Sequence, residues 1–360
     1  MSVFECDAFQ HHESVHFFVD KLTGMKAIIA IHSTDLGPAL GGCRMVRYSN
    51  SDEALTDVLR LSRGMSLKNS LAGLELGGGK AVIMVPESWN NDPKYDGPER
   101  AKLFRAFGRA VDSLGGRYIT AEDMNVSVED ASNIRRSTKY VVGLDTGMGD
   151  PSPFTAQGVF VGMRACIKRA FKTDSFEGLT VAVQGLGKVG WRLCEDLHKA
   201  GANLIVADIV DETLQKAKAE FGATIADKDG IVTTSCDVFA PCARGGVINE
   251  DTIGQVRAKV IAGSANNQLS NDTLGVDLHK AGILYAPDYV INAGGVINIA
   301  PEVQGVIDHK WVAMKVAGLE QTLGEILDKS MAEDRPTNEV ADEIASRRIL
   351  DARIKPMQAA

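Results

Sequence analysis

One short stretch in the second half of the chain limits the possible folds more than any other. Leu179 to Gln184 form a β-rich run, and glycines follow at positions 185, 187 and 190 before a helical pattern begins. The first glycine permits a tight turn, the second lets the backbone approach a ligand, and the third lets the helix pack closely on the sheet. This succession predicts a strand–turn–helix unit of a parallel α/β domain.

A carboxylate at the expected distance supports a nucleotide-binding version of this unit. A second β-rich run begins at Asn203 and ends in Asp208, eighteen residues after Gly190. A carboxylate there accepts hydrogen bonds from the adenosine ribose and repels a 2′-phosphate, which favours NAD over NADP. The alternative is a glycine-rich turn without a ligand. The residues expected to hold the cofactor are Gly185, Leu186, Gly187, Lys188, Val189, Gly190 and Asp208.

The rest of the chain divides into two halves. The second half alternates β-rich runs with helical stretches, which is typical of a parallel sheet with helical crossovers. Residues 147–153 are dense in Gly, Pro and Asp and indicate a connection or hinge. We therefore expect two α/β domains: residues 1–148 and a Rossmann-type domain at 149–336, with a C-terminal helix at about 337–360 packing back on the first. Strands of the second half are expected at 179–184, 203–208, 237–240, 259–262 and 283–286, and helices at 189–200 and 212–221.

Composition excludes several other classes. The 360 residues are 44% hydrophobic and carry a net charge of −8, and no basic cluster favours nucleic acid. Apolar runs are far shorter than the roughly 20 residues that span a bilayer. The N-terminus shows no signal-peptide pattern, and the six cysteines form no CxxC pair, so we expect reduced thiols, no metal site and a cytoplasmic protein.

Two lysines in the first half stand where lysine is poorly hydrated. Lys80 follows three glycines and opens an apolar run, 81–85, that predicts a buried strand. Poor hydration disfavours the ammonium form, so a lysine there is suited to act as a general base. Asn50 or Ser51 is the expected N-cap of a helix whose apolar face ends at Lys68. Lys68 either extends from the helix end into solvent or lies close to Lys80 at a glycine-rich turn formed by the three glycines before Lys80.

Taken together, the motifs resemble a known family. The chain is similar to the glutamate, leucine, phenylalanine and valine dehydrogenases from about Ala27 to Glu302, and most similar to the leucine-specific members. The resemblance implies a substrate-binding and oligomerisation domain before the Rossmann domain. The motifs that carry it are Gly37-Pro-Ala-Leu-Gly-Gly42, Lys68-Asn-Ser70, Gly77-Gly-Gly-Lys80, Thr120-Ala-Glu-Asp123, Gly263-Ser-Ala-Asn-Asn267 and Asn292-Ala-Gly-Gly-Val-Ile-Asn-Ile299.

The resemblance also implies roles for single residues. Lys68 binds the substrate carboxylate, Lys80 activates the water that attacks the imino carbon, and Asp123 moves a proton to and from the amino group. Asn267 orients the substrate and also belongs to the cofactor site, where Thr155 contacts the nicotinamide amide. Asp123 by itself could equally cap a turn or a helix. Further substrate-site residues are Leu40, Gly41, Gly42, Met65, Ala121, Val296 and Ile299, and further cofactor residues are Cys242 and Ala243.

The expected activity is reversible, NAD-dependent oxidative deamination of branched-chain aliphatic L-amino acids. Leu40, Ala121, Val296 and Ile299 would form an aliphatic pocket without a cation for a glutamate side chain. The substrates would be L-leucine, L-isoleucine and L-valine, with their 2-oxo acids and ammonium on the other side, and the enzyme a homo-oligomer, an octamer or a dimer. The same chemistry on phenylalanine or valine is the alternative.

Four departures from the leucine pattern keep the substrate open, and one of them is a longer loop between Pro86 and Pro98. Asn125 stands where the leucine enzymes have glycine and the phenylalanine enzymes have asparagine. Arg244 replaces an aliphatic residue, and Gly190 replaces alanine. Two other classes are weaker. A 2-hydroxy-acid dehydrogenase usually needs a His–carboxylate pair, which the seven histidines do not form with the motifs, and a non-catalytic NAD sensor predicts loss of Lys80 or Asp123.

Overall fold

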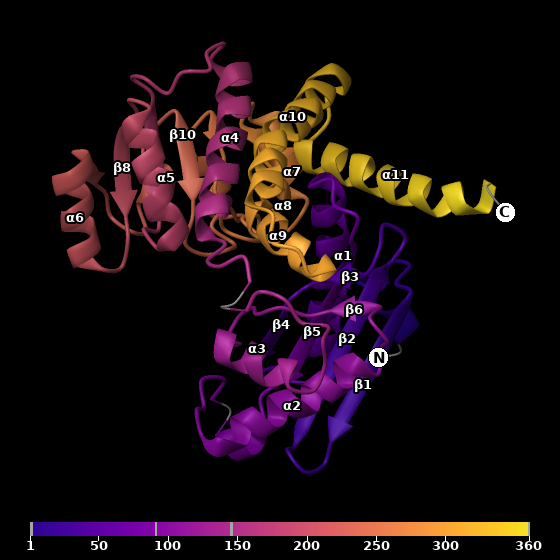
Figure 1. The fold of residues 1–360 in the computed structure, drawn as a ribbon. Coiled ribbons are helices and arrows are strands. Elements are labelled where there is room, and N and C mark those ends of the chain that lie inside the picture. Colours follow the sequence, from indigo (N-terminus) through magenta and orange to yellow (C-terminus); the bar gives the residue numbers. More distant parts are fainter. Residues whose placement is uncertain (1–2, 91, 145–146, 359–360) are drawn as a thin grey trace. The chain divides into compact units, whose positions relative to one another are not determined.

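The computed structural model describes residues 3–90, 92–144 and 147–358 (Figure 1). The chain forms two compact units. Unit 1 comprises Met1–Gly149, Ile299–Asp308 and Ala345–Ala360, and unit 2 comprises Asp150–Asn298 and His309–Ile344. Unit 1 thus includes a short segment, Ile299–Asp308, that the sequence analysis assigns to the second domain. Within unit 1 the Glu302 carboxylate accepts hydrogen bonds from the backbone N–H groups of Gly143 and Met148, which ties this segment to the end of the first half.

Unit 1 is built on a mixed six-stranded sheet. The strand order is β1-β2-β5-β3-β6, and β4 pairs with β5 beside β3. The β1–β2 and β2–β5 pairs are antiparallel, whereas β3 and β4 run parallel to β5. The strands are β1 (Ser14–Asp20), β2 (Met25–Ser33), β3 (Ala39–Leu40), β4 (Cys43–Val46), β5 (Gly77–Met84) and β6 (Tyr118–Ile119).

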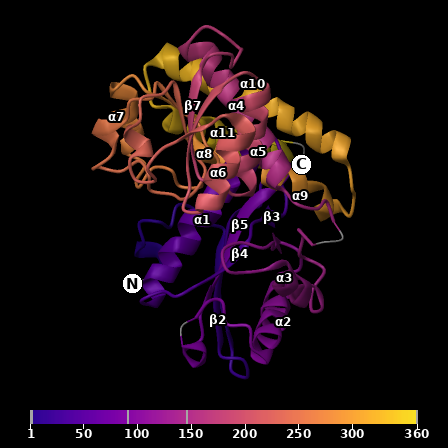
Figure 2. The same ribbon diagram turned by 90° about the vertical axis from the view of Figure 1, so that its left-hand side faces the viewer.

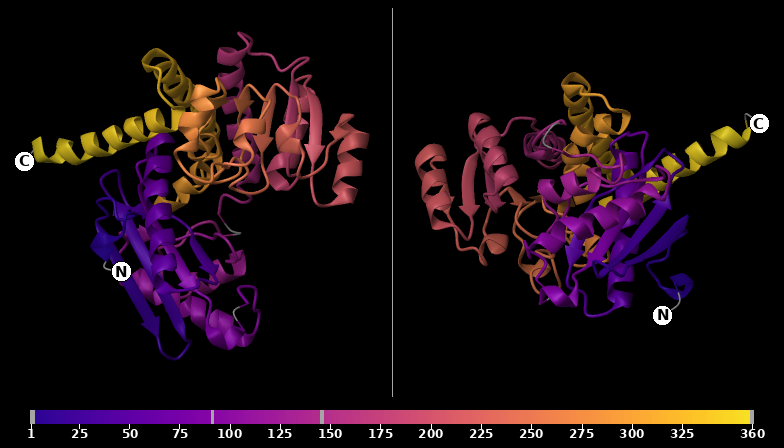
Figure 3. Two further views of the ribbon diagram at one scale, coloured as in Figure 1. Left: turned by 180° about the vertical axis from the view of Figure 1, so that it is seen from behind. Right: turned by 60° about the horizontal axis from the view of Figure 1, so that its bottom comes forward.

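Helices cover both faces of this sheet because β2 and β5 are apolar on both faces. Alternate residues of β2 enter two different cores, as the two-residue side-chain period of a strand requires. One core lies against α1 (Ser51–Leu71), and the other lies against α2 (Pro98–Asp112) and α3 (Val128–Arg135). Figures 1 and 3 show α1 on one face of the sheet and α2 on the other, and Figure 2 shows α2 beside α3.

The helix α1 carries much of the site in unit 1, and both of its ends are held. The Asn50 side chain accepts a hydrogen bond from Glu53 N at 2.9 Å, which confirms the expected N-cap. At the other end, Ser70 Oγ donates to Ala345 O at 3.0 Å, and Arg348 Nη1 donates to Ser70 O at 3.2 Å. Both partners lie on α11 (Thr337–Gln358), so the last part of the chain fixes the end of α1.

Unit 2 contains a fully parallel six-stranded sheet, as the alternating pattern predicts. Its order is β12-β11-β10-β7-β8-β9, and all five strands expected from the sequence are present. The additional strand, β9, has only two residues and gives too short a pattern to detect. The strands are β7 (Thr180–Gln184), β8 (Asn203–Ala207), β9 (Thr224–Ile225), β10 (Val238–Pro241), β11 (Val260–Ile261) and β12 (Leu284–Tyr285).

Helices cover the parallel sheet of unit 2 and begin close to the expected positions. The expected hinge segment, residues 147–153, also contains the start of α4. Pro153 does not prevent this, because a proline in the first turn of a helix lacks only an N–H that would have no partner within the helix. Among the described residues no helix combines the length and apolar character needed to cross a membrane. The helices are α4 (Ser152–Ala170), α5 (Lys188–Lys199), α6 (Asp211–Phe221), α7 (Leu274–Lys280), α8 (Asp288–Ile291), α9 (Gly294–Ile299, which reaches into unit 1) and α10 (His309–Glu333).

Candidate active site

The glycine triplet before Lys80 forms part of a strand, so the expected glycine-rich turn is wrong. β5 begins at Gly77, and Gly78 pairs with Leu40 of β3. A Cβ on Gly78 would lie 2.0 Å from Ser66 N of α1, and a Cβ on Gly79 would lie 2.8 Å from the Tyr118 ring. Glycine is required here because the α1 backbone and an aromatic ring take the space of the missing side chains.

This close packing leaves Lys80 buried beside a carboxylate. Lys80 lies on β5 opposite Ala30 of β2 and is 7% exposed. Its Nζ lies 2.7 Å from Oδ2 of Asp123, which follows β6 in the chain. Two of the residues expected to do chemistry are therefore in direct contact, and an ammonium and a carboxylate at this distance form a strong charge-assisted hydrogen bond.

A third charged residue, which none of the sequence motifs indicates, joins this pair. Arg44 on β4 donates from Nε to the same Asp123 oxygen at 3.0 Å. Burial by itself would raise the pKa of Asp123, but the neighbouring Lys80 and Arg44 outweigh burial and hold that pKa well below its usual range. The signal that could have revealed Arg44 is a cation in the middle of the short apolar strand Cys43–Val46.

Other expected substrate residues of unit 1 surround Asp123. A Cβ on Gly42 would lie 2.9 Å from Asp123 Cβ, and a Cβ on Gly41 would lie 3.2 Å from Met65 Cγ. Met65 and Lys68 are half-buried and lie one turn apart on α1. Gly41, Gly42 and Met65 are thus grouped with the lysine–aspartate pair, and Lys68 follows at the end of the same helix.

The aliphatic residues expected to line a pocket differ in their burial and in the unit to which they belong. Leu40 is fully buried, and Ala121, which accepts a hydrogen bond from Cys43 N through its carbonyl oxygen, is 5% exposed. Ile299 is half-buried and belongs to unit 1, whereas Val296 is buried in unit 2. Complete burial makes Leu40 as suitable for the core of unit 1 as for a pocket wall.

In unit 2 the glycine fingerprint has the geometry expected of a dinucleotide loop. Gly185 has a φ of 95°, and a Cβ there would lie 2.7 Å from Ala243 Cβ. A Cβ on Gly190 would lie 1.9 Å from Gly185 O and 3.4 Å from Cys242 Cβ, so this chain has no room for the alanine of the leucine pattern. Cys242 and Ala243 therefore pack directly on the loop. Burial raises the pKa of the Cys242 thiol, which argues against a nucleophilic thiolate.

Gly187 differs from Gly185 and Gly190, the other two glycines of this loop, in having open space around it. It is the N-cap of α5, has a φ of −65°, and a Cβ there would meet no atom within 4 Å. No side chain caps this helix, so its first N–H groups are available to an anion. The open space and the uncapped helix end fit the pyrophosphate of a dinucleotide, with Lys188 and Val189 in the first turn.

Asp208 holds the fingerprint loop from the neighbouring strand. Its Oδ2 accepts a hydrogen bond from Leu186 N at 2.6 Å, and its Oδ1 accepts one from Val210 N at 2.9 Å. Each carboxylate oxygen has further acceptor capacity for a ribose hydroxyl. A hollow of about 330 Å³ opens beside the loop and is lined by Leu186, Gly187, Lys188, Trp191, Arg192 and Glu195.

Two further expected residues of unit 2 lie on other segments. Thr155 Oγ1 donates to Pro151 O at 3.0 Å, and a Cβ on Gly295 would lie 3.0 Å from that hydroxyl, so Thr155 lies beside the start of α9 and close to Val296. Asn267 is exposed and has a φ of 53°. A positive φ in a residue other than glycine is uncommon and often accompanies a functional position.

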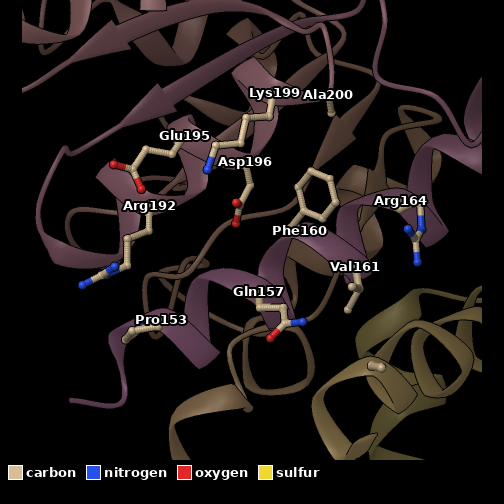
Figure 4. Close-up of a pocket in the computed structure, with 11 residues that line it drawn as sticks. Pro153, Gln157, Phe160, Val161, Arg164, Arg192, Glu195, Asp196, Lys199 and Ala200 are labelled. Atoms are coloured by element: carbon tan, nitrogen blue, oxygen red, sulfur yellow. The ribbon is translucent and has the colours of Figure 1, made fainter. Parts of the chain in front are cut away.

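A larger hollow of about 720 Å³ lies elsewhere in unit 2, between α4 and α5 (Figure 4). Three cations, Arg164, Arg192 and Lys199, and two anions, Glu195 and Asp196, line it together with the Phe160 ring. None of the expected site residues lines it. It shares Arg192 and Glu195 with the smaller hollow beside the glycine loop.

A Rossmann-type sheet with this loop, in one chain with an α/β unit that buries a lysine–aspartate pair, defines a two-domain, dinucleotide-dependent dehydrogenase. Comparison with known sequences makes the class more specific. Residues 10–140 match the family described as Glu/Leu/Phe/Val dehydrogenase, dimerisation domain, and residues 206–352 match Glutamate/Leucine/Phenylalanine/Valine dehydrogenase. The chain belongs to this family of amino-acid dehydrogenases.

Similar proteins carry three different substrate names. Leucine dehydrogenase of Bacillus subtilis (strain 168) is 50% identical over 341 residues, covering 94% of this chain and 91% of that protein. Phenylalanine dehydrogenase of Thermoactinomyces intermedius is 45% identical, covering 96% and 94%. The crystal structure of L-tryptophan dehydrogenase from Nostoc punctiforme has a TM-score of 0.85 at 42% identity, covering 98% and 99%. The reaction class is common to all three names, and the side chain of the substrate is not.

Proposed function

We propose that this chain is an NAD-dependent dehydrogenase that reversibly deaminates branched-chain aliphatic L-amino acids, with L-leucine as the principal substrate. The reaction converts L-leucine, NAD⁺ and water into 4-methyl-2-oxopentanoate, ammonium, NADH and a proton. The observation that carries the proposal is the 2.7 Å contact between buried Lys80 and Asp123, in a chain that also holds a dinucleotide loop. The 50% identity to a leucine dehydrogenase supports the choice of substrate.

Three side chains of unit 1 would handle the amino acid. Lys68 would pair with the substrate carboxylate and fix its position. Asp123 would receive the substrate amino group at its carboxylate. Because its pKa is so low, Asp123 would pass a proton on rather than store it at neutral pH. Lys80, once neutral, would take a proton from the water that attacks the imino carbon.

The dinucleotide loop fits NAD by its open space at Gly187 and its uncapped helix end. When bound, NAD⁺ supplies the acceptor for the hydride that leaves the substrate Cα. Lys188 and Val189 would lie along the pyrophosphate, with Cys242 and Ala243 behind the loop. Asp208 would accept from the ribose hydroxyls and disfavour NADP, and Thr155 and Asn267 would orient the nicotinamide amide and the substrate.

Asn125 gives no reason to prefer phenylalanine as substrate. It has a φ of 58°, and its amide donates to Met45 O at 3.0 Å. Glycine and asparagine are the two residues that most readily adopt this left-handed conformation. The exchange of glycine for asparagine is therefore explained by the backbone, and Arg244, whose side chain is exposed, leaves the NAD preference to Asp208.

The aliphatic character of Leu40, Ala121, Val296 and Ile299 supports branched-chain substrates over glutamate, because these four residues supply no cation for a second carboxylate. One methylene in an apolar pocket changes binding by only about 1–3 kcal/mol, so leucine, isoleucine and valine should overlap. Phenylalanine or valine dehydrogenase activity is the alternative, and the identity to a phenylalanine dehydrogenase supports it.

We also propose a homo-oligomer, a dimer or an octamer. Phe17 and Val19 lie on β1 at the edge of the unit 1 sheet and are 56% and 69% exposed. An exposed apolar edge strand favours association, and the family description of residues 10–140 as a dimerisation domain agrees with it. Light scattering on the purified protein tests this proposal, and a monomer would contradict it.

The deciding experiment measures NADH formation with a panel of L-amino acids, once with NAD and once with NADP. Leucine, isoleucine and valine should turn over fastest, and only with NAD. Replacing Lys80 by Ala should lower turnover by about 10²–10⁴-fold and leave NADH binding unchanged, whereas Lys26→Ala, an exposed lysine on β2, should change neither. Retained turnover in Lys80→Ala would disprove the assignment of the base.

A further inference from the structure

The two oxygens of the Asp123 carboxylate have different neighbours. Oδ2 receives both Lys80 Nζ at 2.7 Å and Arg44 Nε at 3.0 Å. Oδ1 has no hydrogen-bond partner in the part of the chain that the structure describes. A carboxylate held by two cations on one oxygen keeps a fixed orientation, and its second oxygen remains available to a bound molecule.

Arg44 continues the network away from Asp123. Its Nη1 lies 3.5 Å from Oδ2 of Asp57 on α1, and the same oxygen accepts a hydrogen bond from the Tyr48 hydroxyl at 2.6 Å. The Arg44 side chain is 16% exposed, so its guanidinium is poorly hydrated and depends on these two carboxylates. Lys80, Asp123, Arg44, Asp57 and Tyr48 thus form one continuous chain of polar contacts.

We propose that Arg44 is a positioning residue for the deamination: it holds Asp123 by Oδ2 so that Oδ1 faces the substrate amino group, and it shares the charge of this carboxylate so that Lys80 releases its proton more readily. The inference rests on the proposed function and adds a residue that neither the motifs nor the expected roles include.

The electrostatic part follows from the geometry. A lysine paired alone with a carboxylate holds its proton tightly, which opposes its use as a base. A second cation on the same carboxylate oxygen offsets part of that attraction and repels the ammonium directly. Because guanidinium stays charged at all working pH values, Arg44 can exert this effect throughout the pH range of the reaction. Asp57 weakens the effect by neutralising part of the Arg44 charge.

The other ionisable groups around Lys80 should not obscure the effect of Arg44 on Lys80. Burial raises the pKa values of Cys43 on β4 and Tyr118 on β6 well above their usual range, so both stay neutral. Asp130 on α3 is paired with Arg100 at 2.6 Å. On β2, burial lowers the pKa of His32 to about 4, below any useful assay. The neighbouring α1 carries three cations: Arg60, which is exposed, Arg63, which helps to lower the pKa values of His12 and His32, and Lys68, which the substrate carboxylate would engage. All three are unchanged in the variants below.

The first test uses Arg44→Gln in the full-length protein. Removing the cation leaves Asp123 to Lys80 alone, so the acidic limb of the deamination pH profile should move up by about one pH unit. The alkaline limb of the reverse amination should move up with it. Arg44→Lys keeps the charge and should hold the midpoint within a few tenths of a unit, with a lower rate because the planar fork is lost.

The variant Asp57→Asn should move the pH profile in the opposite direction. Without Asp57 the full Arg44 charge acts on Asp123 and Lys80, so the acidic limb should move down by a few tenths of a pH unit. This variant also tests the proposal if Arg44→Gln does not fold. The matched control is Arg109→Gln, which removes an arginine of unit 1 whose side chain is 59% exposed and which pairs with Asp20. Its profile should equal that of the unchanged protein.

A second readout separates this inference from the proposed function. The rate at which a small acylating reagent modifies Lys80, followed by peptide mass spectrometry across pH, reports the neutral fraction of this lysine without any turnover. The labelling midpoint should rise in Arg44→Gln and fall in Asp57→Asn. Unshifted midpoints in both variants would overturn the role of Arg44 even in an active enzyme. An unchanged protein that deaminates no amino acid would overturn the proposed function instead, whatever the labelling shows.

Discussion

Both units place three glycines beside a strand, but the two sets of glycines face different neighbours. In unit 1, Gly77–Gly79 lie inside β5, where the backbone of Ser33 and Gly37, the backbone of α1 and the Tyr118 ring occupy the space of the three missing side chains. In unit 2, Gly187 at the start of α5 faces no atom of the chain within 4 Å. The first set is required by the packing of the protein on itself, whereas no contact with the described residues requires glycine at position 187.

The polar groups of the two units differ in the same way: those of unit 1 contact one another, and those of unit 2 surround an open loop. Unit 1 buries charged and polar side chains around α1 and β5, where Lys80, Arg44 and Asp123 satisfy one another. Unit 2 uses Asp208 to hold backbone N–H groups of an open loop. A buried ionic network orients catalytic groups precisely, whereas an open loop with free N–H groups suits a large, exchangeable anion.

The largest effect should come from Gly78→Ala. The new Cβ would lie 2.0 Å from Ser66 N and 2.3 Å from Ser66 Oγ, and a backbone atom cannot move aside without displacing α1. We expect a loss of more than about 4 kcal/mol in the free energy of unfolding, or no folded protein. Urea unfolding and soluble yield measure this. Near-native stability would show that β5 and α1 are not packed as described.

The second prediction concerns acid and the histidines of unit 1. His12 Nε2 lies 3.0 Å from Leu59 O on α1, and His32 Nδ1 lies 2.8 Å from Ser66 Oγ. Burial lowers the pKa of both to about 4. Both are neutral in the folded state, and the unfolded chain takes up their protons below pH 6.5. The free energy of unfolding should therefore fall by on the order of 3 kcal/mol between pH 6.5 and 4.5.

Hydrogen exchange followed by mass spectrometry locates this effect. Peptides of α1 should lose protection between pH 6.5 and 4.5 more steeply than peptides of α5, after correction for the intrinsic exchange rate. His32→Gln should flatten the dependence, and His309→Gln, an exposed histidine on α10, should not. Equal loss of protection in α1 and α5 would contradict the assignment of acid sensitivity to unit 1.

Gly187→Ala should separate binding from stability. Its φ of −65° suits alanine and no atom lies within 4 Å of the added Cβ, so the main cost is a poorer N-cap and the free energy of unfolding should fall by no more than about 1 kcal/mol. The methyl group would occupy the space expected for the pyrophosphate and should weaken NADH binding at least about tenfold. Fluorescence titration with NADH measures this. Unchanged affinity would show that the open space is not the cofactor site.

The smallest effect provides the matched control for both glycine variants. Gly318 lies in the middle of α10 and is exposed, and a Cβ there would also meet no atom within 4 Å. Gly318→Ala should stabilise the protein by about 0.5–1 kcal/mol, because alanine loses less backbone entropy in a helix. NADH affinity should not change. A loss of stability would indicate that this face of α10 is covered in the oligomer.

Sequence patterns predicted the fold of unit 2 better than that of unit 1. Apart from the two-residue β9, the strands of the parallel sheet lie in short apolar runs that are recognisable by themselves. In unit 1, β3 and β6 have two residues each and form only because β5 and one another supply the hydrogen-bond partners. The early start of β5 was also missed, since glycine triplets are typical of turns and only the facing α1 makes them necessary in a strand.

The site shows the same division between local and distant information. The N-cap of α1, the glycine spacing of the dinucleotide loop and Asp208 after β8 are local patterns, and the structure places them as expected. Arg44 had no such pattern, because a single cation in a four-residue strand carries no periodic signal. Its significance depends on the approach of Asp123, 79 residues further along the chain.

Sequence patterns are sufficient to predict the two-domain α/β class, the parallel sheet of unit 2, the glycine-rich turn between β7 and α5, and the family. These features depend on side-chain periodicity and on backbone freedom within about 20 neighbouring residues, which a sequence displays directly. Three features depend on the three-dimensional structure: the glycine triplet forms part of a strand, Asn125 adopts a left-handed backbone conformation, and Arg44 and Lys80 share one oxygen of Asp123. Each of these depends on atoms from distant segments meeting within a few ångströms, and close packing rather than local pattern selects such contacts.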